Sequence, residues 1–186
     1  EILAYHEGGH ALVAASLEHT EPVHKVTVVP RGRSRGSTHQ LPEEDRYIYR
    51  EAELLDRIAV TLGGRASERL VFDTSTSGAE DDLKQATSLA RRMVLRWGMS
   101  ESLGPFASGA QEDQVFLSEE IARQRDHSEE TAREVDMEVR RILEEAQERA
   151  VAILEESRDA LDRVAEALRE KEEITGEEVE EILGRA

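Results

Sequence analysis

Two histidines, His6 and His10, stand four residues apart in a segment that has the periodicity of an α-helix. The residues on one face of this helix, predicted over about residues 1–17, recur at steps of three and four: Leu3, His6, His10, Val13 and Leu17. This spacing places the two imidazoles one turn apart, close enough to bind one metal ion. The alternative is a pair of ordinary core histidines, but buried imidazoles need polar partners. The pair therefore favours a metal site.

Glu7 completes the pattern H-E-x-x-H and lies about 100° around the helix from His6, beside the metal rather than on it. Zinc lowers the pKa of a bound water from about 16 to about 7, and a neighbouring carboxylate can then accept the proton. The hydroxide attacks a polarised peptide carbonyl, and the base passes the proton to the leaving amine. The motif therefore predicts peptide-bond hydrolysis with Glu7 as the base.

A catalytic zinc ion takes three protein ligands and keeps one position open, so a third ligand is needed. Asp82 lies about 50° from the centre of the apolar stripe of its helix, although it could simply stabilise the helix dipole there. That stripe consists of Leu83, Ala86, Leu89, Ala90, Met93, Val94 and Trp97. Glu68 is the rival, but it lies about 130° from the stripe of its own helix, as expected of a group beside the site or a surface acid.

Composition narrows the range of partners. The chain has no cysteine, which excludes disulfides and leaves His, Asp and Glu as zinc ligands. Its formal net charge of -17 repels phosphate backbones and so disfavours nucleic acid. No apolar run approaches the roughly 20 residues of a membrane span, and no signal peptide is visible. Because the chain starts at Glu1 inside a helical pattern, we interpret it as a soluble fragment of a longer protein.

The remaining patterns predict a mainly α fold with a small β element. A strand is expected near residues 23–30 and a short edge strand near 37–41, which leaves His24 and His39 at the surface. Helices are expected over about 47–70 and, after a loop over 74–78, to about 97, followed by an irregular segment to 127. An acidic helical hairpin follows from Ser128, with a capping box at Thr175 for a last short helix.

Three glycines inside predicted helices weaken helix propensity, which suggests a reason in packing. Gly63 and Gly64 are expected to allow close packing against a neighbouring element, and Gly8 to let another backbone approach. We treat residues 1–186 as a single domain, divided into a zinc-site subdomain over 1–127 and a helical subdomain over 128–186.

Seven blocks of sequence resemble the FtsH family, the membrane-anchored AAA proteases, over essentially the whole chain. They are AYHEGGHALV, PVHKVTVVPRG, LPEED, LGGRASERLVF, TSGAEDDLKQAT, WGMSESLGP and SEETAREVDMEVRRIL. The resemblance implies one zinc ion held by His6, His10 and Asp82, with Glu7 as the base. It also implies that Glu68 stands near the site without being a ligand.

The resemblance further implies that an extended polypeptide substrate adds as a strand at the edge formed by Gly36, Ser37 and Thr38. Here Ser37 replaces an aromatic residue that is typical of the family, and Gly8 replaces an alanine. The implied fold is a mostly helical peptidase domain. The implied assembly is a homo-hexamer in the full-length protein, with an upstream ATPase module that unfolds and feeds substrates.

ATP would bind that module alone, because this chain has no G-x-x-x-x-G-K-[ST] loop. The implied location is the cytoplasmic face of the bacterial inner membrane, or an organellar membrane in a eukaryote, with membrane contact through segments outside this chain. Two functions are thus weighed. One is a zinc metalloendopeptidase of unfolded or membrane-extracted proteins, and the other is a catalytically silent helical module for oligomerisation. The intact motif positions favour the peptidase.

Overall fold

The structure, a computed structural model, describes residues 1–29, 37–40, 48–105, 107 and 128–185, without the side chains of 39 and 40. Within these ranges it contains six α-helices, one 3₁₀ helix and three short β-strands. The predicted mainly α fold with a small β element is confirmed. Gly36 and most of the irregular segment predicted over 99–127 lie outside the described residues.

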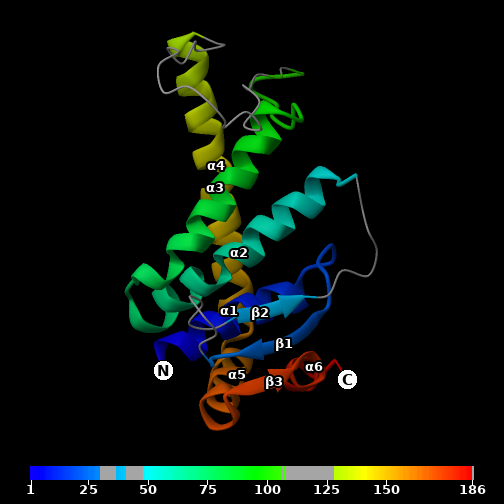
Figure 1. Ribbon diagram of the computed structural model, residues 1–186, viewed down its shortest axis with the longest axis vertical. Coiled ribbons are helices and arrows are strands. Elements are labelled where there is room, and N and C mark those ends of the chain that lie inside the picture. The colour runs from blue at the N-terminus through cyan, green and yellow to red at the C-terminus, as the bar shows by residue number, and fades with distance from the viewer. Residues whose placement is uncertain (30–36, 41–47, 106, 108–127, 186) are drawn as a thin grey trace, which may run out of the picture.

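Helix α1 (Ile2–Ser16) lies at the centre of the molecule, in contact with α2 (Glu51–Phe72), α5 (Arg158–Lys171) and the sheet (Figure 1). The sequence predicted one buried face, whereas every residue from His6 to Ala14 is buried. The reason is that helices and strands cover α1 on several sides. The histidines and Glu7 are therefore enclosed by the protein.

Two glycines allow α1 and α2 to cross with their backbones in contact. A Cβ on Gly9 would overlap the carbonyl oxygen of Gly63, and a Cβ on Gly63 would lie 2.8 Å from the carbonyl oxygen of Gly9. Close packing at the glycine pair of α2 is thus confirmed. The expectation for Gly8 is wrong, because its nearest neighbour is the side chain of Val164, at 3.2 Å from a Cβ. The close backbone approach occurs one residue later.

Helix α3 (Glu80–Leu95) follows the 3₁₀ helix η1 (Ser77–Ala79) and packs against α2 and α4 (Glu129–Glu156) (Figure 1). The middle of its predicted apolar stripe is buried, but Leu83 is 41% exposed and Trp97 is 44% exposed. The packed face is thus shorter than the apolar stripe of the sequence. Helix α4 begins as predicted, since the side chain of Ser128 accepts a hydrogen bond from the backbone of Thr131.

The predicted C-terminal hairpin is wrong. Ser157 alone separates α4 from α5, and backbone hydrogen bonds from Ser157 to Ile153 and from Leu161 to Ser157 continue across the junction. A helical hairpin needs a loop of about 2–5 residues to reverse the chain, and one residue can only bend it. Helix α4 accordingly packs on α2 and α3, whereas α5 packs on α1.

A three-stranded antiparallel sheet lies beside α1, in the order β2-β1-β3. Strand β1 (Val23–Thr27) pairs with β2 (Ser37–Gln40) on one side and with β3 (Glu173–Thr175) on the other. The sequence patterns did not predict β3. Strand β2 is an edge strand, as expected, and it contacts α1. Helix α6 (Gly176–Leu183) begins at the predicted capping box of Thr175 and Glu178. None of the helices in the described ranges has the length and apolar character of a membrane span.

Candidate metal centre

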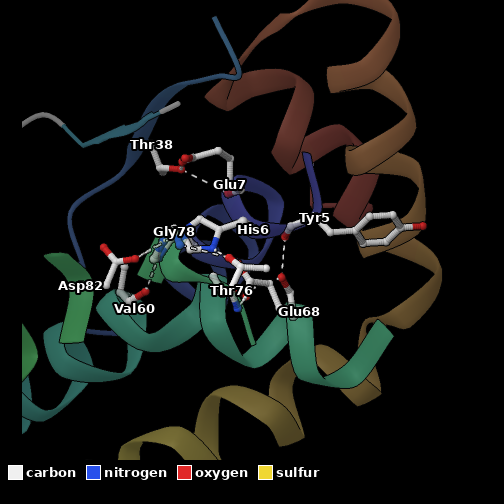
Figure 2. A network of polar contacts seen from close by, with 12 residues as sticks. Tyr5, His6, Glu7, Thr38, Val60, Glu68, Thr76, Gly78 and Asp82 are labelled. Carbon is white, nitrogen blue, oxygen red and sulfur yellow. Dashed lines mark hydrogen bonds and ion pairs between the residues drawn. The ribbon is translucent and has the colours of Figure 1, made fainter. Parts of the chain in front are cut away.

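Three side chains from two helices converge on one point, and Figure 2 labels two of them, His6 and Asp82. The Nε2 atoms of His6 and His10, both on α1, lie 3.1 Å apart. Oδ2 of Asp82, near the start of α3, lies 3.2 Å from Nε2 of His6 and 3.5 Å from Nε2 of His10. The structure therefore brings together the three residues that the sequence singled out as ligands.

The outer nitrogen of each imidazole already has a partner. Nδ1 of His10 lies 2.8 Å from the backbone oxygen of Val60, which can only accept a hydrogen bond, so this Nδ1 carries the proton. Nδ1 of His6 lies 2.8 Å from Oε1 of Glu68 and donates to that carboxylate. In these neutral tautomers both Nε2 atoms point lone pairs toward Asp82. The inner atoms of the site are three acceptors that face one another.

Three facing acceptors need a cation between them, and their spacing fits zinc. Ligand atoms about 2.0–2.2 Å from one ion in tetrahedral geometry lie about 3.3–3.6 Å from each other. Of the three separations found here, 3.5 Å lies in that range, and 3.1 and 3.2 Å lie just below it. Two imidazoles and one carboxylate are also a donor set that zinc accepts in catalytic sites. The residues present therefore fit the ion.

Gly64 of α2 provides space for the two imidazoles. A Cβ at this position would lie 2.5 Å from Nε2 of His10 and 2.6 Å from Nε2 of His6. No side chain fits there without displacing the histidines. The glycine pair of α2 thus has two separate roles: Gly63 admits the backbone of α1, and Gly64 leaves room for the ligand atoms.

Glu68 links the site to the loop that precedes α3. Its carboxylate accepts hydrogen bonds from the backbone N–H of Thr76 at 2.8 Å and from the Thr76 hydroxyl at 2.9 Å, besides that from His6. Glu68 is 1% exposed, so it is a group beside the site and not a surface acid. The sequence patterns did not identify Thr76 or the Val60 carbonyl, and backbone acceptors leave no signal in side-chain patterns.

Glu7 points toward Thr38 on strand β2 (Figure 2), and its carboxyl is near enough to His6, His10 and Asp82 to feel their charges. The hydroxyl of Thr38 lies 3.2 Å from Oε2 of Glu7 and 3.1 Å from the Glu7 backbone oxygen. Glu7 is 5% exposed. Burial raises the pKa of Glu7 above its ordinary value, against the lowering effect of the two histidines and the Thr38 hydroxyl. A carboxyl with a raised pKa is well suited to take up and release a proton.

The ligands shift each other's protonation. Hydrogen bonds between the imidazoles and Asp82 require a proton on Nε2, at the place that a cation would otherwise take. Burial lowers the pKa of His6, but the hydrogen bonds that its doubly protonated ring makes with Asp82 and Glu68 outweigh burial and leave this pKa above its ordinary value. Burial raises the pKa of Asp82, but such hydrogen bonds with His10 and His6 reverse the effect and hold it well below its usual range. Asp82 therefore stays ionised, and it offers a negative charge to whatever cation lies between the imidazoles.

The fold and these side chains define a class of protein: a helical domain that gathers two imidazoles and a carboxylate around one point beside a buried glutamate, as metal-dependent hydrolases do. The sequence matches peptidase family M41 over residues 1–182. The chain belongs to this family. The resemblance to FtsH proteases, first noted in seven blocks of sequence, is thereby confirmed.

Curated FtsH proteases are similar to this chain over nearly its whole length. The chain is 54% identical over 179 residues to an ATP-dependent zinc metalloprotease FtsH 2 of Salinibacter ruber, an overlap that covers 96% of this chain and 26% of the relative. It is 54% identical over 187 residues to the FtsH protease of Kosmotoga olearia, covering 100% of this chain and 29% of the relative. The FtsH protease of Nitrosococcus oceani is 50% identical over 183 residues, with 98% and 29% covered. The chain thus spans less than a third of the length of these relatives.

Proposed function

We propose that this chain is the peptidase domain of an ATP-dependent zinc metalloprotease and that it hydrolyses peptide bonds. The observation that carries the proposal is the convergence of His6, His10 and Asp82, whose ligand atoms have the spacing of a tetrahedral zinc site. Glu7 lies beside this point, buried and with a raised pKa. Metal ligands and a base are the two components that H-E-x-x-H peptidases need.

Each residue has a definite task in this mechanism. When bound, zinc acts as a Lewis acid that polarises the peptide carbonyl and lowers the pKa of water. Glu7 accepts the proton of the attacking water and later donates it to the leaving amine. Glu68 and the Val60 carbonyl keep the Nδ1 protons in place, so that both Nε2 atoms remain lone-pair donors.

The proposal extends to the longer protein. We propose that an upstream ATPase module binds ATP and delivers unfolded or membrane-extracted polypeptides. The names of the relatives, which are ATP-dependent proteases, support this proposal. The assembly would be a homo-hexamer at the cytoplasmic face of a bacterial inner membrane, or at an organellar membrane. Strand β2 would receive the substrate as an added strand, since it lies at the edge of the sheet next to α1.

Replacing the base tests the proposed chemistry. Glu7→Gln keeps the size of the side chain but cannot take up the proton, so it should retain zinc and lose casein hydrolysis in the full-length protease. The measurements are zinc content and the rate of casein cleavage. Unchanged hydrolysis by Glu7→Gln would contradict the assignment of the base. An unchanged full-length protein that binds zinc but does not hydrolyse casein would favour the catalytically silent oligomerisation module, for which no structural observation speaks.

Replacing the third ligand tests the metal site separately. Asp82→Ala should strip or strongly weaken the bound zinc, because two imidazoles would be left without the carboxylate. Asp81→Ala is the matched control, since Asp81 is the neighbouring acid and its side chain is 86% exposed. Full zinc occupancy in Asp82→Ala would move the third ligand to Glu68.

A further inference from the structure

One hydroxyl joins the edge strand to the buried glutamate of α1. Oγ1 of Thr38, on β2, lies 3.1 Å from the backbone oxygen of Glu7 and 3.2 Å from its Oε2. Both oxygens are acceptors, so the hydroxyl is the donor in each contact. A hydroxyl has one proton, which is shared between the two oxygens of the same residue. The contact therefore fixes the position of the helix and the direction of the carboxylate together.

Thr38 cannot easily leave this position. Its backbone pairs with Val26 in the centre of the sheet, and β1 is pinned on its other side by β3. Threonine is also stiff at its first side-chain torsion, because it is branched at Cβ. The hydroxyl is thus presented by a strand that is paired into the sheet, whereas a glutamate side chain has three torsions of its own.

Building on the proposed function, we propose that Thr38 is a positioning residue for the reaction. Its hydroxyl holds the carboxylate of Glu7 in the direction required for proton transfer. The strand at which a polypeptide would add is therefore the same strand that aligns the base. This arrangement couples the placement of the substrate with the placement of Glu7, since both depend on the position of β2.

The test compares Thr38→Val with Thr38→Ser in the full-length protease, using casein and ATP. Valine keeps the branched shape and the strand preference but has no hydroxyl, whereas serine keeps the hydroxyl. Thr38→Val should lower kcat by about 10- to 100-fold, the loss expected when a reacting group is misplaced. KM, zinc content and thermal midpoint should stay at the values of the unchanged protein. Thr38→Ser should restore most of kcat.

Two results would overturn the proposal. An unchanged kcat in Thr38→Val would show that the hydroxyl does not align the base. A higher KM with an unchanged kcat would assign Thr38 to strand packing or substrate pairing instead. Glu7→Gln is assayed in parallel, and its unchanged activity would refute the assignment of Glu7 as the base and the role of Thr38 with it, whereas an unchanged protein without hydrolysis would refute the proposed function itself. With Glu7→Gln inactive, the Thr38 variants report on Thr38 alone.

Discussion

Oε1 of Glu68 lies 2.8 Å from Nδ1 of His6, and the two residues come from different helices, 62 positions apart in the sequence. The same carboxylate binds the backbone and the hydroxyl of Thr76, in the loop that leads into α3. One buried acid thus orients an imidazole of α1 and fixes the approach of the helix that carries Asp82. The two sides of the metal site are linked through a residue that does not face the metal itself.

Replacing Glu68 should therefore weaken metal binding without removing a ligand. In Glu68→Gln the charge is lost and the hydrogen bond to His6 becomes weaker, so the zinc dissociation constant should rise by about 10- to 100-fold. Competition with a chromophoric chelator measures this change. Glu80→Gln is the control, because the Glu80 side chain is 66% exposed and pairs with Lys84. Equal affinities in the two variants would contradict the role assigned to Glu68.

The space above Gly64 gives a second prediction. A methyl group at this position would lie 2.5 Å from Nε2 of His10, so Gly64→Ala should push the imidazoles apart and abolish stoichiometric zinc binding. Zinc content after gel filtration is the measurement. Thr61→Ala, one turn earlier on α2, removes a hydroxyl that bonds to the backbone of Arg57 and should leave the zinc content unchanged. A Gly64→Ala variant with full zinc would show that the imidazoles tolerate the methyl group.

Much of the fold and of the candidate site could be predicted from local patterns. The four-residue spacing of His6 and His10 requires a helix for the two imidazoles to meet, and the segment indeed forms α1. The position of Asp82 near the apolar stripe of its helix predicted that its side chain faces inward, and in the structure it lies next to the histidines. Capping residues such as Ser128 and Thr175 fixed helix starts correctly, because a cap is a contact within a few residues.

Other features depend on contacts between distant segments, for which a single sequence has no signal. The Glu173–Thr175 strand is three residues long and forms because Val26 offers a partner. The prediction of a hairpin was wrong because hydrophobic periodicity indicates which face of a helix is buried. It does not indicate the direction in which the chain continues after Ser157. The carbonyl of Val60 is a backbone atom, so no residue type marks it as the partner of His10.

The crossing of α1 and α2 predicts very different effects for two adjacent glycines. A methyl group at Gly9 would overlap the Gly63 carbonyl oxygen and lie 2.8 Å from Cβ of Ser67, so Gly9→Ala should lower the free energy of unfolding by about 3 kcal/mol. At Gly8 the methyl group meets a side chain of Val164 at 3.2 Å, and the gain in helix propensity of about 1 kcal/mol offsets the contact. Gly8→Ala should therefore be close to neutral. Denaturant unfolding of both metal-free variants measures the difference, and equal losses would refute the backbone contact at Gly9.

The pair Glu138 and Arg141 on α4 predicts how stability depends on pH. Arg141 donates to both carboxylate oxygens of Glu138, at 2.8 and 3.0 Å, and the Glu138 side chain is buried. The hydrogen bond from Arg141 holds the pKa of Glu138 below its usual value of 4.5, outweighing the opposing effect of burial. A carboxyl whose pKa is lowered by folding stabilises the protein above its unfolded pKa. This contribution is lost as the pH falls through the lower, folded pKa.

Glu138→Gln should accordingly be less stable than the unchanged protein at pH 7, by about 1 kcal/mol, since the partner arginine is half exposed and solvent weakens the pair. The difference should shrink as the pH falls from 4.5 through the lower, folded pKa, because first the unfolded and then the folded unchanged protein loses the charge of Glu138. Urea unfolding of the metal-free chain at a series of pH values measures it, because release of metal then makes no contribution. A difference that stays constant or grows toward acid pH would contradict the lowered pKa, since the sign of the linkage allows only a decrease.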